Sequence, residues 1–369
     1  MKVVFLFSHP APYKVDFFNE LSKYVEVTVL FERRSNKDRD EAFYNRNSYQ
    51  FNAIFLGGIN IGKENHYSAN AVSHLKQNHY DLIVINGWRT FTEMKVIEYL
   101  KRNRIPYVFY INGGIAKENE PIFITNVKNR YISGADLYFS PDEASNIYLL
   151  HYGAIKENII NYPYSTIFEN EILKSPLSKQ NKDELRKSLD LPENVDIILS
   201  VGQFIGRKNF FGLLEMWKDM PKDKLLVLIG GGKLKRKFLK YISSNKLSNV
   251  ILHDFMNKNT LLKYMQAADL FVFPSLEDIY GHVINESLTQ GLPVVSSMYV
   301  NAAKKLVKDG YNGFLYKPGC NDDFKTKIIK TLENRSEYSL HAIESSKDST
   351  IENMARFHAR EFKEWVNKE

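Results

Sequence analysis

The chain has 369 residues and a mass of 42.9 kDa, more than one hydrophobic core usually serves, so we expect two domains. The 44% of hydrophobic and 25% of charged residues exclude a disordered, collagen-like or disulfide-rich chain. The formal net charge of +7 is mild and spread along the sequence, which gives little support to nucleic acid binding. The single cysteine, Cys320, cannot form an internal disulfide, so a reducing cytoplasm is expected.

Apolar runs rich in β-formers alternate with amphipathic stretches along the whole sequence, a pattern typical of βαβ units and parallel sheets. In the first half, strands are predicted at residues 3–7, 25–31, 82–86, 107–111 and 137–140. Helices are predicted at residues 15–23, 91–102 and 122–133. In the second half, strands are predicted at residues 197–201, 225–229, 250–253, 270–274 and 293–296. The sequence therefore predicts an α/β protein with two Rossmann-like halves.

The boundary between the halves is predicted from a change in composition. Residues 162–193 are rich in Pro, Ser, Asn and charge and interrupt the strand rhythm, so we place the hinge near residues 164–175. We expect a first domain at residues 1–165, a second at 166–350, and a last amphipathic helix within 351–369.

No apolar run approaches the ~20 residues that span a bilayer, and the short first run predicts a strand and not a signal peptide.

The most informative turn follows the predicted strand at residues 270–274. An acidic stretch leads to Gly281, where a helix begins that ends at Gly291. A glycine lets backbone amides approach a phosphate, and the helix dipole favours an anion there. Glu286, about one turn into this helix, can accept two hydrogen bonds from a ribose diol, and Asp278 can accept from sugar hydroxyls. Either carboxylate taken alone also fits a solvated acidic turn.

A second turn, after the strand at residues 197–201, combines two glycines with two adjacent cations. Gly202 and Gly206 precede Arg207 and Lys208, which suit a diphosphate because Lys acts as a point charge and Arg as a bidentate donor. Alone, this turn fits a solvated basic loop equally well. A third turn closes the next strand with three glycines, which allow a ligand to approach the backbone or simply make a tight connection: Gly230, Gly231 and Gly232.

Taken together, these turns are much more specific than any one of them. The basic turn, the three glycines, Ala267-Ala268-Asp269, the acidic turn and Gly-Leu-Pro-Val follow consecutive strands in one order. This arrangement resembles the nucleotide-binding half of glycosyltransferase family 4, retaining enzymes of the GT-B fold, over residues 196–318. In the first domain, the run His9-Pro-Ala-Pro-Tyr13 resembles the opening of family members that build bacterial surface polysaccharides.

The resemblance implies a role for each matching residue of the second domain. Asp278 would contact the donor sugar, Glu286 the nucleotide ribose and Lys208 the diphosphate. Gln203 stands where the family usually has Arg, and Arg207 could supply the missing charge. Asp278 is also one methylene shorter than the usual Glu. These two departures imply either a different donor sugar or a degenerate, non-catalytic site.

Further donor contacts are implied around the same turns. The nucleobase would lie near Gly230, Gly231 and the turn with Phe255 and Met256, and His282 would approach the phosphates. The remaining donor-binding positions are Gly202, Gly206, Tyr280, Gly281 and Val283.

The acceptor-binding residues are predicted in the first domain. Asn112 and Gly113 end a strand where family members often carry His, and Asn can donate and accept hydrogen bonds but cannot titrate. A simple strand-terminating Asn-Gly turn is the alternative. His9 and Tyr13 lie beyond the first strand, and Arg89 could meet an acceptor phosphate.

No metal or cofactor is expected. Asp38 and Asp40 form an Asp-x-Asp match of the kind that binds metal in the other major glycosyltransferase fold. They follow a polar run instead of a buried strand end, so we interpret them as part of a solvated loop.

For the whole chain, the resemblance implies two Rossmann-like domains that face each other across a cleft, with the last helix returning to the first domain. It implies retaining transfer from a nucleoside diphosphate sugar, a UDP-sugar, to a saccharide acceptor. A polyprenyl-diphosphate-linked acceptor in capsule or exopolysaccharide synthesis would place the protein in the cytoplasm, at the inner face of the membrane. The alternatives are a pseudoenzyme that binds nucleotide or glycan for a partner, and a nucleotide-sugar epimerase. An NAD-dependent oxidoreductase ranks last, because no G-x-G-x-x-G follows the first strand.

Overall fold

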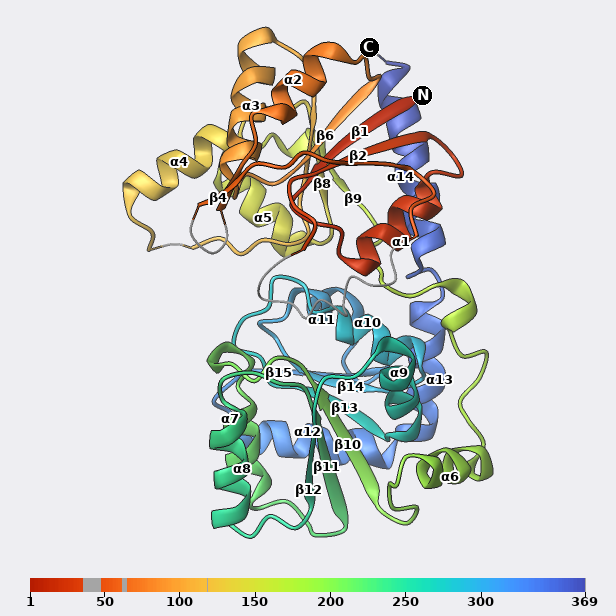
Figure 1. Ribbon diagram of the computed structural model, residues 1–369. Helices are drawn as coiled ribbons and strands as arrows, with labels where there is room; N and C mark the ends of the chain where they lie inside the picture. Colours follow the sequence, from red (N-terminus) through yellow and green to blue (C-terminus); the bar gives the residue numbers. More distant parts are fainter. Residues whose placement is uncertain (36–47, 62–64, 118, 369) are drawn as a thin grey trace. The chain divides into compact units, whose positions relative to one another are not determined.

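The protein folds into two compact units, which we describe one at a time (Figure 1). The computed structural model describes residues 1–35, 48–61, 65–117 and 119–368. The first unit holds Met1–Ser165 and the C-terminal segment that starts at Thr350, and the second holds Thr166–Ser349. None of the described helices has both the length and the apolar character needed to cross a bilayer.

The first unit is built on a parallel sheet, seven strands of it within the described residues, in the order β3-β2-β1-β6-β7-β8-β9. These strands are β1 (Lys2–Phe7), β2 (Glu26–Phe31), β3 (Asn52–Phe55), β6 (Leu82–Asn86), β7 (Val108–Tyr110), β8 (Leu137–Ser140) and β9 (Ile159–Asn161). An antiparallel pair, β4 (Ile59–Ile61) and β5 (Asn65–Tyr67), follows β3. The run Val-Val-Phe-Leu-Phe in β1 is buried throughout, as expected for a parallel strand covered on both faces.

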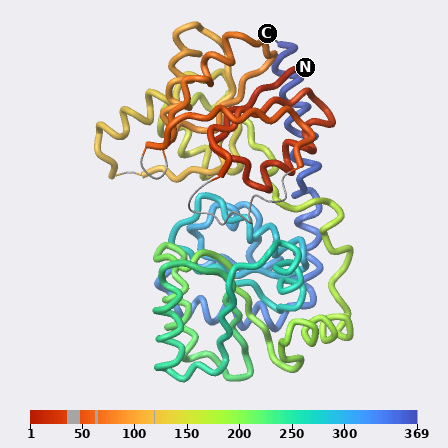
Figure 2. Tube along the Cα trace, in the orientation of Figure 1, coloured from red at the N-terminus to blue at the C-terminus, as the bar shows by residue number. Residues whose placement is uncertain are grey.

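The helices of the first unit are α1 (Pro12–Leu21), α2 (Asn70–Gln77), α3 (Phe91–Asn103), α4 (Ile122–Ile132), α5 (Glu143–His151), the 3-10 turn η2 (Lys156–Asn158) and α14 (Ile351–Val366). Helix α3 begins with a capping box between Thr90 and Glu93, which satisfies two backbone donors at its start. The C-terminal helix α14 lies beside α1 (Figure 2), and the buried ring of His358 lies 4.8 Å from the ring of Phe17. Residues from both ends of the chain therefore share this core.

The second unit has another parallel sheet, with the order β12-β11-β10-β13-β14-β15. Its strands are β10 (Asp196–Val201), β11 (Lys224–Ile229), β12 (Val250–His253), β13 (Leu270–Phe273), β14 (Val294–Ser297) and β15 (Gly313–Tyr316). Its helices are α6 (Lys179–Ser188), α7 (Phe210–Trp217), α8 (Lys235–Ser244), α9 (Lys258–Ala267), α10 (His282–Thr289), α11 (Asn301–Leu306), α12 (Asn321–Glu333) and α13 (Arg335–Ser346), with 3-10 turns η3 (Glu169–Glu171) and η4 (Gly206–Lys208). Counted along the chain, the strand order is 3-2-1-4-5-6, that of a doubly wound Rossmann sheet.

The predicted α/β class with two Rossmann-like halves is confirmed. The helix predicted at residues 15–23 begins earlier, at Pro12, because proline is well placed in the first turn of a helix, where its missing N–H costs nothing. The edge strands β3, β9 and β15 were not predicted. They are short, and each contains a polar residue or a glycine that shortens its apolar run: Asn52, Asn161 and Gly313.

Candidate functional site

The predicted donor residues follow two neighbouring strands of the second sheet. Strands β10 and β13 pair directly, and the chain order reverses between them, which makes this the point where doubly wound sheets bind ligands. The turn after β10 carries Lys208, and the turn after β13 carries Asp278 and Gly281. The fold thus brings together side chains that are 70 residues apart in the sequence.

Hydrogen bonds join the basic and acidic turns. The Leu276 amide donates to the Arg207 carbonyl oxygen at 2.7 Å, and the Arg207 guanidinium donates through Nη1 to the Glu277 carbonyl oxygen at 3.0 Å. Arg207 and Gly206 are exposed, while Gly202 and Gln203 are half-buried. The guanidinium is therefore held at the rim of the acidic turn and faces solvent.

Lys208 and Asp278 form a buried ion pair between Nζ and Oδ2. The two residues are only 9% and 7% exposed, and the Lys208 Nζ also lies 4.6 Å from the centre of the Phe273 ring. Burial lowers the pKa of Lys208, although the Asp278 carboxylate opposes this shift. The two residues that the sequence assigns to different parts of a donor are thus partners of each other.

The start of α10 lies beside this ion pair. Gly281 precedes the helix with a φ of 97°, in the left-handed region that favours glycine, and a Cβ atom there would lie 2.8 Å from Val300 Cγ1. Gly281 offers no side-chain cap, so the amides of the first turn, which His282 and Val283 open, and the helix dipole favour an anion. Tyr280 is buried, and its ring lies 4.9 Å from that of His282.

Glu286 lies on the same helix and accepts a hydrogen bond at its Oε1 from the Thr166 hydroxyl at 2.8 Å. The Lys258 ammonium donates to the Thr166 carbonyl oxygen at 2.7 Å and pairs with Glu171 at 2.6 Å. Burial raises the pKa of Glu286, while the Thr166 hydrogen bond and the charge of Lys258 act in the opposite direction. Thr166 was not predicted from the sequence, because it lies in the irregular segment before α6 and belongs to no motif.

The glycine turn after β11 packs against the basic turn. The Gly202 amide donates to the Ile229 carbonyl oxygen at 3.0 Å, and the Phe204 amide donates to the Gly231 carbonyl oxygen at 2.7 Å. The Phe255 side chain, 60% exposed, lies so close to Gly231 that a Cβ atom there would be 3.1 Å from its ring. Half-buried Met256 follows it. The predicted nucleobase contacts are therefore adjacent to one another.

Substitution of Gly230 tests this close backbone packing. A Cβ atom at position 230 would lie 1.9 Å from the Gly202 carbonyl oxygen, and the φ of 155° is itself in the strained range. We expect Gly230→Ala to lower the free energy of unfolding by about 1–3 kcal/mol or more, because backbone atoms must move. Gly206→Ala is the matched control, since no described residue beyond its neighbours lies within 4 Å of its Cβ position. Urea denaturation of both variants is the measurement, and equal stability would contradict the prediction.

The predicted acceptor residues follow three adjacent strands of the first sheet. His9 and Tyr13 follow β1, Arg89 follows β6, and Asn112 and Gly113 follow β7. The order of the first sheet also reverses between β1 and β6, so these residues lie at the edge where doubly wound sheets generally bind ligands. Arg89 is exposed and the other four are half-buried.

Lys14, next to Tyr13, was not predicted as a site residue from the sequence. A lysine in the first turn of a helix opposes the helix dipole, and this unfavourable placement was a signal that could have found it. The side chain of Lys14 reaches Asn112, where its Nζ donates to Oδ1.

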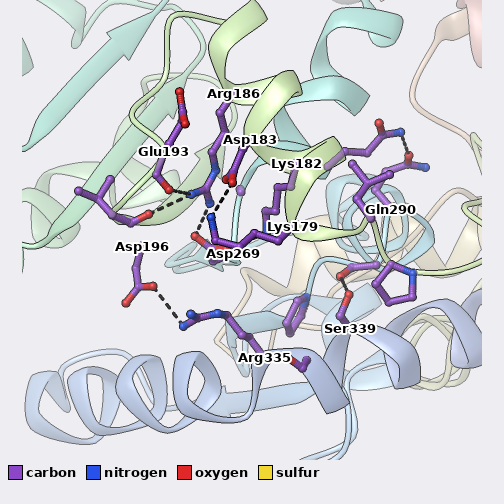
Figure 3. A pocket seen from close by; sticks show the side chains of 18 of the residues that line it. Lys179, Lys182, Asp183, Arg186, Glu193, Asp196, Asp269, Gln290, Arg335 and Ser339 are labelled. Atoms are coloured by element: carbon purple, nitrogen blue, oxygen red, sulfur yellow. Dashed lines mark hydrogen bonds and ion pairs between the residues drawn. The ribbon is translucent and has the colours of Figure 1, made fainter.

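A cavity of about 840 Å³ lies at the opposite edge of the second sheet, near the amino ends of β10, β13 and β14 (Figure 3). None of the predicted site residues lines it. Arg186 donates to the Ala267 carbonyl oxygen at 2.9 Å and pairs with Asp269 at 2.6 Å, and Lys182 pairs with Asp269 at 2.7 Å. Arg335 pairs with Asp196 at 3.1 Å. The contacts of Arg186 and Lys182 hold α6 against the sheet, and the Arg335 pair joins α13 to β10, so these charges have a structural role.

The residues that the structure describes contain no cluster of three His, Cys, Asp or Glu side chains that could hold a metal ion. The Asp38 and Asp40 pair lies outside the described residues. Whether the reaction needs a metal therefore stays a prediction.

Comparisons with known proteins cover both the sequence and the fold. Residues 181–349 match the family model described as glycosyl transferases group 1. The chain is 31% identical over 136 residues to an uncharacterized glycosyltransferase of Methanocaldococcus jannaschii, a match covering 37% of this chain and 38% of that one. It is 29% identical over 151 residues to the lipopolysaccharide core biosynthesis glycosyltransferase LpsE of Rhizobium meliloti, covering 41% and 44%. The matches thus span about two fifths of these relatives.

Several solved structures match along nearly the whole chain. HepE of Anabaena in complex with UDP has a TM-score of 0.77 at 18% identity and covers 99% of this chain and 100% of its own. Sucrose-phosphate synthase from Thermosynechococcus elongatus has a TM-score of 0.78 at 16% identity, with 100% of both chains covered. At this identity the likeness shows the fold, and the predicted GT-B class is confirmed. Residues 181–349, within the second unit, are therefore similar to the glycosyl transferases group 1.

Proposed function

We propose that this protein is a retaining glycosyltransferase that moves a sugar from a UDP-sugar to a saccharide acceptor. The observation that carries this proposal is the meeting of three features at one switch point of the second unit. A buried lysine, Lys208, an uncapped helix start at Gly281 and a carboxylate on the same helix, Glu286, lie where Rossmann sheets bind nucleotides.

The names of similar proteins support the choice of substrates. HepE was crystallised with UDP and with UDP-glucose. A relative from Escherichia coli, 28% identical over 164 residues, is a UDP-Gal:alpha-D-GlcNAc-diphosphoundecaprenol alpha-1,3-galactosyltransferase. We extend these properties to this chain as proposals: a uridine nucleotide as leaving group and a lipid-linked saccharide as acceptor, in surface polysaccharide synthesis.

The proposed reaction depends on stabilising the charge of the departing diphosphate. The bond between the anomeric carbon and the phosphate oxygen breaks while the acceptor oxygen bonds to the same face of the sugar, and the acceptor proton passes to the leaving oxygen. Lys208, Arg207 and the amides that follow Gly281 meet the growing negative charge without a metal ion. The diphosphate replaces Asp278 as the partner of Lys208, which frees the Asp278 carboxylate to accept from sugar hydroxyls.

A thermal-shift screen with UDP, GDP, ADP and dTDP tests the donor assignment. Binding of one nucleotide to the native state raises the free energy of unfolding by about 2.7 kcal/mol at a hundredfold excess over its dissociation constant. We expect the largest rise with UDP and its loss in Glu286→Ala. If no nucleotide stabilises the protein, the proposed function is wrong.

Association with a membrane is proposed from an exposed apolar helix start. Ile122 and Phe123 begin α4 and are 79% and 68% exposed, and the nearby Lys117 is exposed as well. Bulky apolar side chains next to a cation suit the interface of an anionic bilayer. This surface would bring the first unit to a lipid-linked acceptor at the inner face of the cytoplasmic membrane.

Flotation with liposomes that contain anionic lipid measures this association. We expect the wild type to float, and the double variant with Ile122→Ser and Phe123→Ser to float at least about tenfold less, since each apolar side chain contributes about 1.5–3 kcal/mol on full burial. Leu340→Ser is the matched control, because Leu340 is 56% exposed on the second unit. Equal flotation of all three proteins would exclude α4 as the anchor.

A further inference from the structure

A buried lysine lies beneath the predicted acceptor edge of the first unit. Lys14 is 3% exposed, and its Nζ lies 4.7–5.5 Å from the ring centres of Phe7, Tyr13, Tyr110 and Tyr164. In the described part of the chain, no ion pair includes it. Aromatic faces compensate a desolvated cation only in part, and burial accordingly lowers the pKa of Lys14 well below its usual value. Burying a lysine here costs desolvation free energy, which indicates that its hydrogen bond has a role in the protein.

Lys14 donates this hydrogen bond to Asn112, and most of the donors and acceptors of the Asn112 side chain are engaged in the protein. Its Oδ1 accepts from Lys14 Nζ and, at 3.1 Å, from the Tyr164 hydroxyl. Its Nδ2 donates to Asn86 Oδ1 at 2.9 Å. An asparagine amide has two lone pairs on its oxygen and two N–H groups. Both lone pairs are therefore occupied, and one N–H group remains.

Lys14 also determines which way the amide faces. In its ammonium form Lys14 only donates, so a rotated Asn112 would turn its N–H groups toward another donor and leave the buried Nζ without a hydrogen bond. Asn86 at the opposite side completes the arrangement by accepting from Nδ2. The sequence alone indicated that Asn112 can both donate and accept. With the hydrogen bonds in the structure, what remains for a ligand is an N–H donor of Asn112.

We propose that Lys14 is a positioning residue that fixes Asn112 as a hydrogen-bond donor to an anionic oxygen of the acceptor substrate. This inference rests on the proposed function, which places Asn112 at the acceptor site. The Lys14 hydrogen bond polarises the amide and strengthens the remaining N–H as a donor. A phosphate or carboxylate oxygen takes this bond better than a neutral hydroxyl does, since hydrogen bonds to ionised acceptors are about twice as strong.

The side-chain amide of Asn112 gives a direct readout in the full chain. Protein labelled with ¹⁵N-asparagine is titrated with inorganic phosphate and, separately, with acetate, and Asn112→Asp identifies the signal by its loss. We expect one of the two anions to shift the wild-type Nδ2 proton. A shift with phosphate alone indicates a phosphorylated acceptor, and a shift with acetate alone indicates an acidic sugar. If neither anion shifts the signal, the preference for an anionic oxygen is wrong.

Three variants separate positioning from a structural role. Lys14→Met removes the donor and is expected to weaken the anion response at least about tenfold, whereas Lys14→Gln keeps an N–H donor and should restore it. Lys23→Met is the control, because Lys23 pairs with Glu20 near the surface. An unchanged response in Lys14→Met, or none in Lys14→Gln, contradicts the proposal. UDP binding to the same samples tests the proposed function separately, since it reports on the second unit.

Discussion

Replacing Lys208 by methionine is expected to lower the rate of sugar transfer by about 10²–10³-fold, the usual cost of removing one group that stabilises transition-state charge. Lys208 is a buried cation beside the uncapped start of α10, so no solvent ion readily takes its place. Release of UDP from a UDP-sugar in the presence of acceptor is the measurement. Lys208→Arg keeps the charge and is expected to retain more activity than the methionine variant.

The Lys208 variant needs a control for stability. Loss of the cation leaves the buried Asp278 carboxylate uncompensated, which costs on the order of 3–5 kcal/mol. The double variant with Lys208→Met and Asp278→Asn removes both charges, so we expect it to recover stability in urea but not the transfer rate. Asp278→Asn alone is expected to tighten UDP binding, since the diphosphate no longer competes with a carboxylate for Lys208. A folded double variant with a near-normal rate would exclude Lys208 from catalysis.

The central strands could be predicted from the sequence because their burial leaves a local signal. β1 and β13 consist almost entirely of apolar residues that are buried in the sheet. The edge strands β3 and β15 each pair with a single neighbouring strand. The asparagine in β3 and the glycine in β15 shorten their apolar runs, so the sequence does not identify these strands. These two strands form because the sheet offers them hydrogen bonds, a tertiary effect, whereas the edge strand β12 was predicted from its own apolar run at Val250–His253.

In the candidate site, too, features within a few residues of each other could be predicted, and contacts between distant residues could not. Gly281 and Glu286 could be identified because a glycine before a helix and a carboxylate one turn later lie within a few residues. The pairing of Lys208 with Asp278 and of Thr166 with Glu286 could not, because these partners are 70 and 120 residues apart. Sequence patterns predict which groups a turn carries, and the strand order decides which turns meet.

Two buried glutamates of the first unit, Glu32 and Glu93, show how contacts between distant residues change pKa values. Glu32 follows β2, and its Oε1 accepts from the Thr90 hydroxyl at 2.7 Å. Glu93 accepts at Oε2 from the Thr90 amide at 2.9 Å. Both residues are buried, 0% and 2% exposed, and neither takes part in an ion pair within the described ranges. Burial raises the pKa of Glu32 to about 7, and burial together with the charge of Glu32 raises that of Glu93 to about 8.

This pair is expected to make the first unit less stable as the pH rises toward 8. In the unfolded chain, both carboxyls titrate near the ordinary value of 4.5. Between pH 4.5 and 8 the folded state therefore holds more protons than the unfolded state, so the stability that protonation provides is complete below pH 4.5 and is lost as the pH passes the folded values. The loss is on the order of a few kcal/mol, since each unit of pKa difference corresponds to about 1.4 kcal/mol.

Glu32→Gln isolates the contribution of the pair. Glutamine resembles the protonated acid and can still accept from Thr90, so the variant should match the wild type at pH 5 and exceed it in stability at pH 8. Glu98→Gln, on the same helix as Glu93, is the control with the opposite sign. At Glu98, burial is outweighed by hydrogen bonds from Tyr131 and Lys95, which lower its pKa. Its replacement should therefore reduce stability at pH 8. Urea midpoints of the full chain at both pH values are the measurement, and a Glu32→Gln curve parallel to that of the wild type would show that the two carboxyls do not hold a proton at neutral pH.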